Sequence, residues 1–272
     1  MSQTPTNAAP SVEGSMFLFR KPELLTKEAH GGMGIVRPDQ PFGFAATARA
    51  VPLVLTEIPT AMRDYPIIFT NKDKPMPMAV LGLVEDENMF VDEKGEWEDR
   101  RYIPGYLRRY PFALATDKET NDPQGQRMAL IVDAEFEGLS ASAPDENKFF
   151  AGDGPSASLQ QALDYCQSYE RDFAQTVQLA QVLSSYDVLT EQFGQYTPPG
   201  KTAQPFARYF GIDEDRLKSL ADDKILELRK NGVLPLLYAQ MMSMGNWTSI
   251  IDRRAKRYNL TGEDVIKPRV TN

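Results

Sequence analysis

Two residue types that carry much of enzyme chemistry are almost absent from this chain of 272 residues. It contains one cysteine, Cys166, and one histidine, His30. A single cysteine cannot form an internal disulfide, which fits a reducing compartment, and we expect a cytoplasmic protein. The same scarcity excludes zinc sites built from several Cys and His ligands and the two-histidine iron triad. A Ser-His-Asp arrangement could use only His30, whereas a metal held by carboxylates alone stays open.

Long apolar runs and an excess of positive charge are also missing. No run of 18 apolar residues occurs, so we expect no membrane span. Residues 1–25 have no positively charged region ahead of an apolar stretch, and we therefore expect no secretory signal peptide. The net charge is −8 and the pI is near 4.9. Such a surface repels phosphate backbones, so we expect no nucleic-acid partner.

The residues that are present indicate a soluble globular protein. Apolar residues make up 42% of the chain and charged residues 25%. Residues 1–15 are rich in Ser, Thr, Asn, Ala and Pro, and we expect a disordered tail there. We expect an α+β core with one long helix over 16–200, followed by a helical segment over 201–272 that packs on the core.

The middle of the chain predicts a small, mainly antiparallel sheet formed from segments 65–136. Short apolar runs bounded by turn residues are typical of strands. Such runs predict strands at 65–71, 76–84, 88–91, 112–116 and 127–136. Before them, Pro52 and Pro59 interrupt a helical pattern, so we expect a short helix over 52–63 that is kinked or restarted at Pro59.

A long helix is predicted over 158–190. From Leu159 onward, apolar residues recur at spacings of three and four, the period of a helix with one buried face. Either Ser156 or Ser158 can cap its N-terminus. The run FGQYTPPGK over 193–201 predicts a turn after it.

The remainder of the chain also has helical spacing. Asp213 is positioned to cap a short helix, and Gly232 to end a second one as a left-handed C-terminal glycine. A final helix is predicted from Pro235 to Tyr258. Together these segments place the protein in the α+β class, with a small antiparallel sheet packed against one long helix and a C-terminal helical segment.

The run YIPGYLRRYPFALA over 102–115 is the strongest candidate for a ligand site. Guanidinium groups bind carboxylates and phosphates through paired hydrogen bonds, and tyrosine hydroxyls can add further bonds. The alternative is that the tyrosines pack in the core and the arginines pair with the acidic run Glu93–Asp99. No catalytic residue can be assigned. The predicted ligand-binding residues are Tyr102, Tyr106, Arg108, Arg109 and Tyr110.

Other candidate residues are weaker. His30 has no convincing carboxylate nearby to orient it, and we interpret it as a surface or loop histidine. Cys166 falls on the apolar stripe of the long helix, which predicts a buried and inert thiol. The loop AGDGPS over 151–156 lacks the Lys-Ser/Thr pair of a phosphate-binding loop. The methionines Met241, Met242 and Met244, together with Trp247, predict core packing or a soft partner surface.

Several blocks in order resemble the SapC family of bacterial proteins. They are AVPLVLTEIPTAMRDYPIIF, MAVLGLVEDENMFVD, YIPGYLRRYPFAL and ILELRKNGVLPLLYAQMMSM, and the resemblance spans about 20–255. It implies a link to surface-layer protein transport and to loci that encode TonB-dependent receptors and flavin-dependent tryptophan halogenases. The resemblance implies no established catalytic residue.

Two functional hypotheses follow. The first is a non-enzymatic accessory protein that binds a protein or peptide partner in connection with surface-layer protein export or TonB-dependent uptake. The second is an enzyme or small-molecule-binding protein that holds an anionic carboxylate or phosphate ligand in an Arg/Tyr clamp. Neither hypothesis calls for a cofactor or a metal.

Overall fold

A computed structural model describes residues 16–116 and 128–269. The α+β class is confirmed: every strand pair in this part of the chain is antiparallel, and one long helix runs through it. The predicted tail over 1–15 lies outside the described residues. The chain divides into two units, here called unit 1 (1–41 and 108–170) and unit 2 (42–107 and 171–272).

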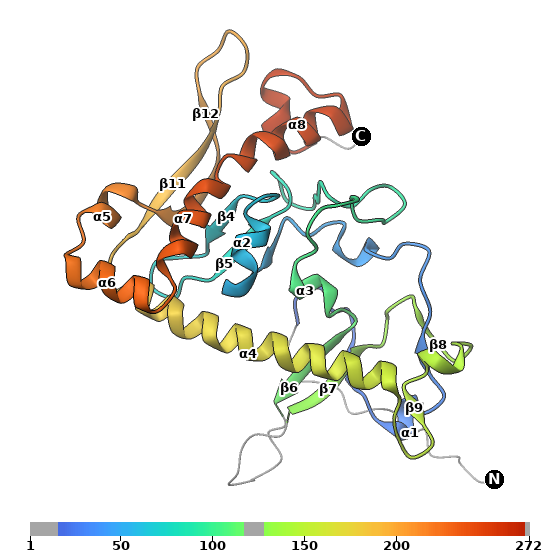
Figure 1. Cartoon of the computed structure of the whole chain (residues 1–272). Helices are drawn as coiled ribbons and strands as arrows, with labels where there is room; N and C mark the ends of the chain where they lie inside the picture. The colour runs from blue at the N-terminus through green and yellow to red at the C-terminus, as the bar shows by residue number, and fades with distance from the viewer. Residues whose placement is uncertain (1–15, 117–127, 270–272) are drawn as a thin grey trace. The chain divides into compact units, whose positions relative to one another are not determined.

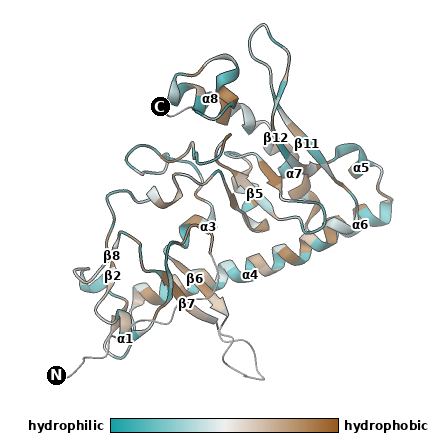
Figure 2. Ribbon diagram, turned by 180° about the vertical axis from the view of Figure 1, so that it is seen from behind, coloured by the Kyte–Doolittle hydropathy of each residue, from teal (hydrophilic) through white to brown (hydrophobic). Residues whose placement is uncertain are grey.

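Unit 1 is built on a three-stranded sheet in the order β1-β7-β6, of which Figure 1 labels β6 and β7. Its core joins Val132, Phe149 and Leu159, and the strands β6 and β7 are largely hydrophobic (Figure 2). Two small strand pairs and a short helix complete the unit. The elements are β1 (Pro22–Leu24), α1 (Lys27–His30), β2 (Gly34–Ile35), β6 (Phe112–Thr116), β7 (Met128–Asp133), β8 (Leu139–Ser140), η3 (Asp145–Asn147), β9 (Phe150–Ala151) and β10 (Gly154–Pro155).

Unit 2 is built on a five-stranded sheet in the order β11-β12-β4-β5-β3. Its core cluster includes Phe69 from β4, Ile212 from β12 and Leu237 from α7. In Figure 1 the β11–β12 ribbon extends well beyond the short strands β4 and β5. The elements are η1 (Gly43–Ala45), β3 (Ala50–Pro52), η2 (Leu55–Glu57), α2 (Ile58–Ala61), β4 (Ile67–Phe69), β5 (Pro77–Val80), β11 (Leu189–Tyr196), β12 (Gln204–Ile212), α5 (Glu214–Lys218), α6 (Asp222–Lys230), α7 (Leu234–Ser243), α8 (Asn246–Tyr258) and η4 (Gly262–Ile266).

Two helices cross from one unit to the other. The short helix α3 spans Gly105–Arg108, and the long helix α4 spans Ala157–Ser185. Helix α4 begins as predicted, because the Ser156 hydroxyl accepts a hydrogen bond from the Leu159 N–H at 3.1 Å. It ends slightly earlier than predicted: Asp187 is left-handed, with φ of 51°, and a strand follows at once.

Local helix signals were correct elsewhere too. Asp213 caps α5 by accepting a hydrogen bond from the Arg216 N–H, and Gly232 follows α6 with φ of +70°.

Two predicted helices differ in extent from those in the structure. The helix predicted over 52–63 is shorter, with η2 and α2 in succession and Pro59 in the first turn of α2. The predicted final helix is divided into α7 and α8 around Met244 and Gly245.

The prediction of one sheet over 65–136 was wrong. Strands β4 and β5 belong to the sheet of unit 2, whereas β6 and β7 pair with β1 in unit 1. No strand forms over 88–91, where a single bridge joins Val91 to Trp97. The Asn88 amide explains this, since it bonds to the Ala45 carbonyl and accepts from the Phe90 N–H, which leaves the backbone in a loop.

The predicted turn over 193–201 was too long, and the strand that follows it was not predicted. Residues 189–196 and 204–212 form the two longest strands described. Gly194 was interpreted as a turn residue, but it serves a close approach: a Cβ there would lie 2.7 Å from the Phe206 ring. The actual turn is tighter and includes Gly200, with φ of +72°.

Candidate functional site

The segment that carries the predicted clamp is held in unit 2 by two buried carboxylates. Asp64 accepts hydrogen bonds from the Tyr102 N–H and from Arg101 Nη1, both at 2.9 Å. Glu57 accepts bonds from the Tyr102 hydroxyl at 2.7 Å and from the Gly105 N–H at 2.5 Å. The first N–H groups of a helix have no partner within the helix. Glu57 therefore satisfies the start of α3 while it orients Tyr102.

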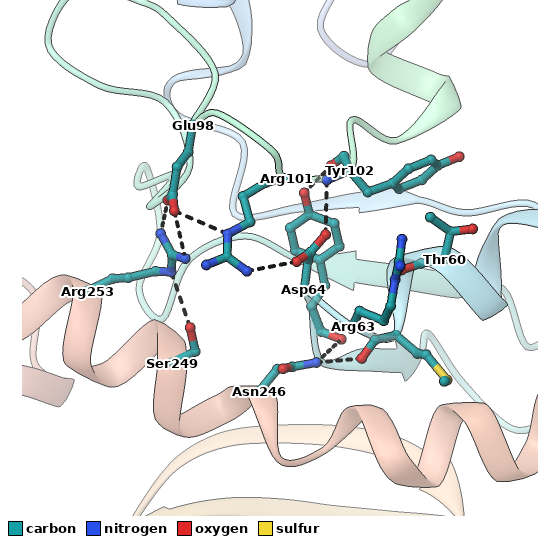
Figure 3. Close-up of polar contacts among 11 residues, drawn as sticks. Thr60, Arg63, Asp64, Glu98, Arg101, Tyr102, Asn246, Ser249 and Arg253 are labelled. Carbon is teal, nitrogen blue, oxygen red and sulfur yellow. Dashed lines mark hydrogen bonds and ion pairs between the residues drawn. The ribbon is translucent and has the colours of Figure 1, made fainter.

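An alternating row of charges continues from Asp64 to α8 (Figure 3). Arg101 lies between Asp64 and Glu98, with Arg101 Nε 3.2 Å from Glu98 Oε1. Glu98 in turn accepts two bonds from the guanidinium of Arg253, which stacks 4.5 Å from the centre of the Phe90 ring. Burial lowers the pKa of Arg253. Both arginines have carboxylate partners here, so the network anchors the segment before α3 to α8.

Tyr65 and Asn246 add two further anchors in the same network. The Tyr65 side chain is fully buried, and its hydroxyl donates to the Tyr102 carbonyl. Burial raises the pKa of the Tyr65 hydroxyl most, and the negative charge of neighbouring Asp64 raises it further. Asn246 of α8 donates to the Met62 and Tyr65 carbonyls at 2.7 and 3.1 Å (Figure 3). These contacts join the end of α2 to α8.

The Asp133 carboxylate accepts hydrogen bonds from four donors in unit 1. It is fully buried and accepts bonds from the Tyr110 hydroxyl at 2.8 Å and from the N–H groups of Arg20, Lys21 and Glu135 at 2.9, 2.8 and 3.2 Å. Burial, and then the bond to this carboxylate, raise the pKa of Tyr110. The carboxylate at the end of β7 thus holds the segment that leads into β1.

Arg109 and Arg108 have different environments. Arg109 is 8% exposed, donates to Glu170 Oε1 at 3.0 Å and stacks 4.7 Å from the centre of the Tyr169 ring. Burial raises the pKa of Glu170, while Arg109 acts in the opposite direction. Arg108 is exposed and lies 5.4 Å from the Tyr165 ring centre. The packing alternative placed these arginines beside Glu93–Asp99, but the partner of Arg109 comes from α4.

The five predicted clamp residues belong to different units. Tyr102 and Tyr106 lie in unit 2, while Arg108, Arg109 and Tyr110 lie in unit 1. Tyr106 is 8% exposed. Within its own unit, each of Tyr102, Arg109 and Tyr110 contacts an internal carboxylate. That these residues bind an anion stays a prediction.

His30 was predicted to be a surface or loop histidine, and this was wrong, because it is a buried residue of helix α1. It is 5% exposed at the end of α1, where its Nδ1 accepts a bond from the Thr26 N–H at 3.3 Å. Its Nε2 lies 4.0 Å from a carboxylate oxygen of Glu23 on β1. The sequence did not show that Glu23 lies near His30, because the pairing of β1 with β7 in unit 1 positions Glu23.

Cys166 is buried as predicted, at 1% exposure, and burial raises the pKa of its thiol to about 11. The thiolate is the reactive form of cysteine. A pKa two units above the ordinary thiol value of 9.0 lowers the thiolate fraction at pH 8 by about 100-fold. We expect an aromatic disulfide reagent to modify Cys166 slowly in the native protein and at the ordinary thiol rate in denaturant. Equal rates in both conditions would contradict this assignment.

The methionine-rich segment of α7 has one buried and one exposed face. Met241 packs against the core cluster of unit 2. The ring centres of Trp247 and Phe206 lie 5.2 Å apart. Met242 is 71% exposed and Tyr238 is 43% exposed. Core packing therefore accounts for only part of this segment.

Strand β11 forms one edge of the five-stranded sheet. Its inner side pairs with β12 over its whole length, and no strand among the described residues pairs with its outer side. The side chains of Glu191, Phe193 and Gln195 are exposed, and the residues between them in the strand are less exposed. Phe193 is 53% exposed. This edge was not predicted from the sequence, although the alternation of polar and apolar residues in LTEQFGQY is the pattern that indicates a strand.

Comparisons with known proteins identify a family for this chain. The model of the SapC family matches residues 25–250, whereas no curated protein and no solved structure matches the chain. Over the described ranges, no helix has the length and apolar character needed to cross a membrane. The same ranges contain no cluster of three His, Cys, Asp or Glu side chains that could hold a metal ion.

Proposed function

Because the chain belongs to the SapC family, we propose that it is a non-enzymatic accessory protein that binds an extended peptide segment of a partner protein. The proposal places it in the cytoplasm, in connection with surface-layer protein export or TonB-dependent uptake. The open edge of β11 is the observation that carries it. An edge strand exposes a row of N–H and C=O groups, and an extended peptide can pair with them as an additional strand.

The details of the edge fit this mode of binding. Strand β11 has eight residues and contains no proline, so each backbone amide retains its donor. The register irregularity at Gly194 and Gln195 places the extra residue, Phe206, in β12 and leaves the outer edge of β11 continuous. The exposed Phe193 ring lies beside this edge and can pack against an apolar side chain of the added strand.

A displayed library of eight-residue peptides, selected on the full chain, tests this proposal. We expect selected peptides to protect the amides of 189–196 from hydrogen exchange and to bind Phe193→Ser at least about tenfold more weakly. Met242→Ser is the matched control, because Met242 is an exposed apolar side chain on a helix. This control should bind the peptides as the unchanged chain does.

Two results would contradict the proposal. Peptides that protect other segments and bind Phe193→Ser normally would place recognition elsewhere. A concentration-dependent dimer that protects the amides of 189–196 would assign the edge to a second copy of this chain. Sedimentation of the chain without peptide separates this second case from peptide binding.

A further inference from the structure

Unit 2 contains an open hollow with a volume of about 580 Å³. This volume lies within the range of small-molecule sites. The walls come from four segments: Arg49 ahead of β3, the loop 83–87 after β5, Phe206 of β12, and 266–269 at the end of η4. All four belong to unit 2. The hollow is distinct from the residues of the predicted clamp.

Arg49 is the unusual member of this lining. Its carbonyl oxygen accepts bonds from the Leu81 and Gly82 N–H groups at 2.7 and 3.0 Å, so its main chain is fixed. Its side chain is partly buried, yet its guanidinium has no hydrogen bond, ion pair or ring contact with any residue that the structure describes. A partly desolvated cation without a partner is costly. Such a group is typical of a site that receives its counter-charge from a ligand.

Other buried or partly buried arginines in this protein have carboxylate partners. The buried or partly buried Arg109, Arg253 and Arg254 each pair with a carboxylate at contact distance. Among the arginines within 16–116 and 128–269, Arg49 alone is partly buried and has no partner. The exception lies in the wall of the hollow.

The remaining charges of the hollow nearly balance one another. Glu87 is neutralised by Arg254, with Nε and Oε2 2.6 Å apart. Arg269 adds a second cation, stacked 3.9 Å from the centre of the Tyr258 ring. Glu85 and Asp86 add two exposed carboxylates, and no ion pair involves either of them in the described chain. A simple anion would be attracted by the cations and repelled by these carboxylates, whereas a zwitterion can satisfy both.

We propose that this hollow binds a small zwitterion with an apolar body, of the α-amino-acid class. Arg49 takes the carboxylate of the ligand, and the carboxylates of Glu85 and Asp86 take its ammonium group. The apolar part of the ligand packs among the apolar members of the lining, which are Leu83, Val84, Phe206, Ile266 and Pro268. This site does not depend on the proposed peptide binding at β11.

Calorimetry with three matched probes tests the charge requirement. Phenylalanine carries both charges, N-acetylphenylalanine only the negative one and phenylalaninamide only the positive one. We expect phenylalanine to bind, and each blocked form to bind at least about tenfold more weakly. Equal binding of N-acetylphenylalanine would overturn the zwitterion assignment, and no binding of phenylalanine below about 10 mM would overturn the site.

Two variants test the assigned residues. Arg49→Met retains the backbone bonds and the length of the side chain, and should weaken phenylalanine binding at least about tenfold. Asp86 has φ of 59°, a conformation that asparagine tolerates, so Asp86→Asn should fold normally and also weaken binding. Arg229→Met is the control, because Arg229 is exposed and is not part of the lining. Unchanged binding by Arg49→Met would overturn the proposal, and the β11 peptide assay on the same variant should remain normal.

Discussion

Replacing Arg254 with methionine is expected to lower the free energy of unfolding by about 3–5 kcal/mol, as found when one partner of a buried ion pair is removed. The Arg254 side chain is fully buried and bonds to both carboxylate oxygens of Glu87, at 2.6 and 3.1 Å. Its remaining donors bind the carbonyl groups of Asp264, Val265 and Lys267. The variant leaves Glu87 without its counter-ion and three carbonyls without their donor. Chemical denaturation measures the difference.

Two further variants isolate the cause of this loss. Lys256→Met changes an exposed cation on the same helix and should alter the free energy of unfolding by less than about 0.5 kcal/mol. The double variant Arg254→Met with Glu87→Met removes both charges and should be more stable than Arg254→Met alone, because no unpaired carboxylate remains. A loss below about 1 kcal/mol in the single variant would show that the pair does not hold α8 to the loop 85–88.

Replacing Asp133 with alanine is expected to lower the free energy of unfolding of unit 1 by about 3–5 kcal/mol. The change removes the acceptor of three backbone N–H groups and of the Tyr110 hydroxyl. Each buried donor left without an acceptor costs about 1–3 kcal/mol, although such costs do not simply add. Denaturation followed by tyrosine fluorescence measures the total loss.

Hydrogen exchange gives Asp133→Ala a local readout. The amides of Arg20 and Lys21 should exchange faster in the variant, because their shared acceptor is gone. Glu137→Ala is the control: Glu137 is exposed on the loop after β7, and its removal should leave both amides protected. Unchanged protection in Asp133→Ala would show that β1 pairing alone holds this segment.

Short-range chemistry explains which parts of the fold were predictable. Ser156 and Asp213 act on N–H groups three residues away, and Gly232 acts through its own φ angle. The apolar stripe of α4 repeats within one helix. Strand β11 was missed because its Gly194 resembled a turn residue. Only the packing of the Phe206 ring over Gly194 across the two strands shows why a glycine is needed there.

The predicted clamp shows the same limit in the candidate site. The sequence directed attention to 102–110, and in the structure Tyr102 bonds to the buried Glu57 and Tyr110 to the buried Asp133. It could not tell that Tyr102 bonds to Glu57, 45 residues earlier, or that Arg109 bonds to Glu170, 61 residues later. Nothing in the sequence distinguished Arg49 from other arginines, because the absence of a partner is recognised only when the surroundings of the side chain are known.

The sequence by itself determined the α+β class, the long helix, the helix caps at Ser156, Asp213 and Gly232, and the resemblance to the SapC family. Each of these depends on contacts between residues a few positions apart or on the order of short blocks. The tertiary structure alone decided which strands share a sheet, which carboxylates are satisfied, and that the partly buried Arg49 has no partner among the described residues. Bonds such as those from Arg20 to Asp133 and from Arg254 to Glu87 join residues 113 and 167 positions apart, and no local pattern encodes them.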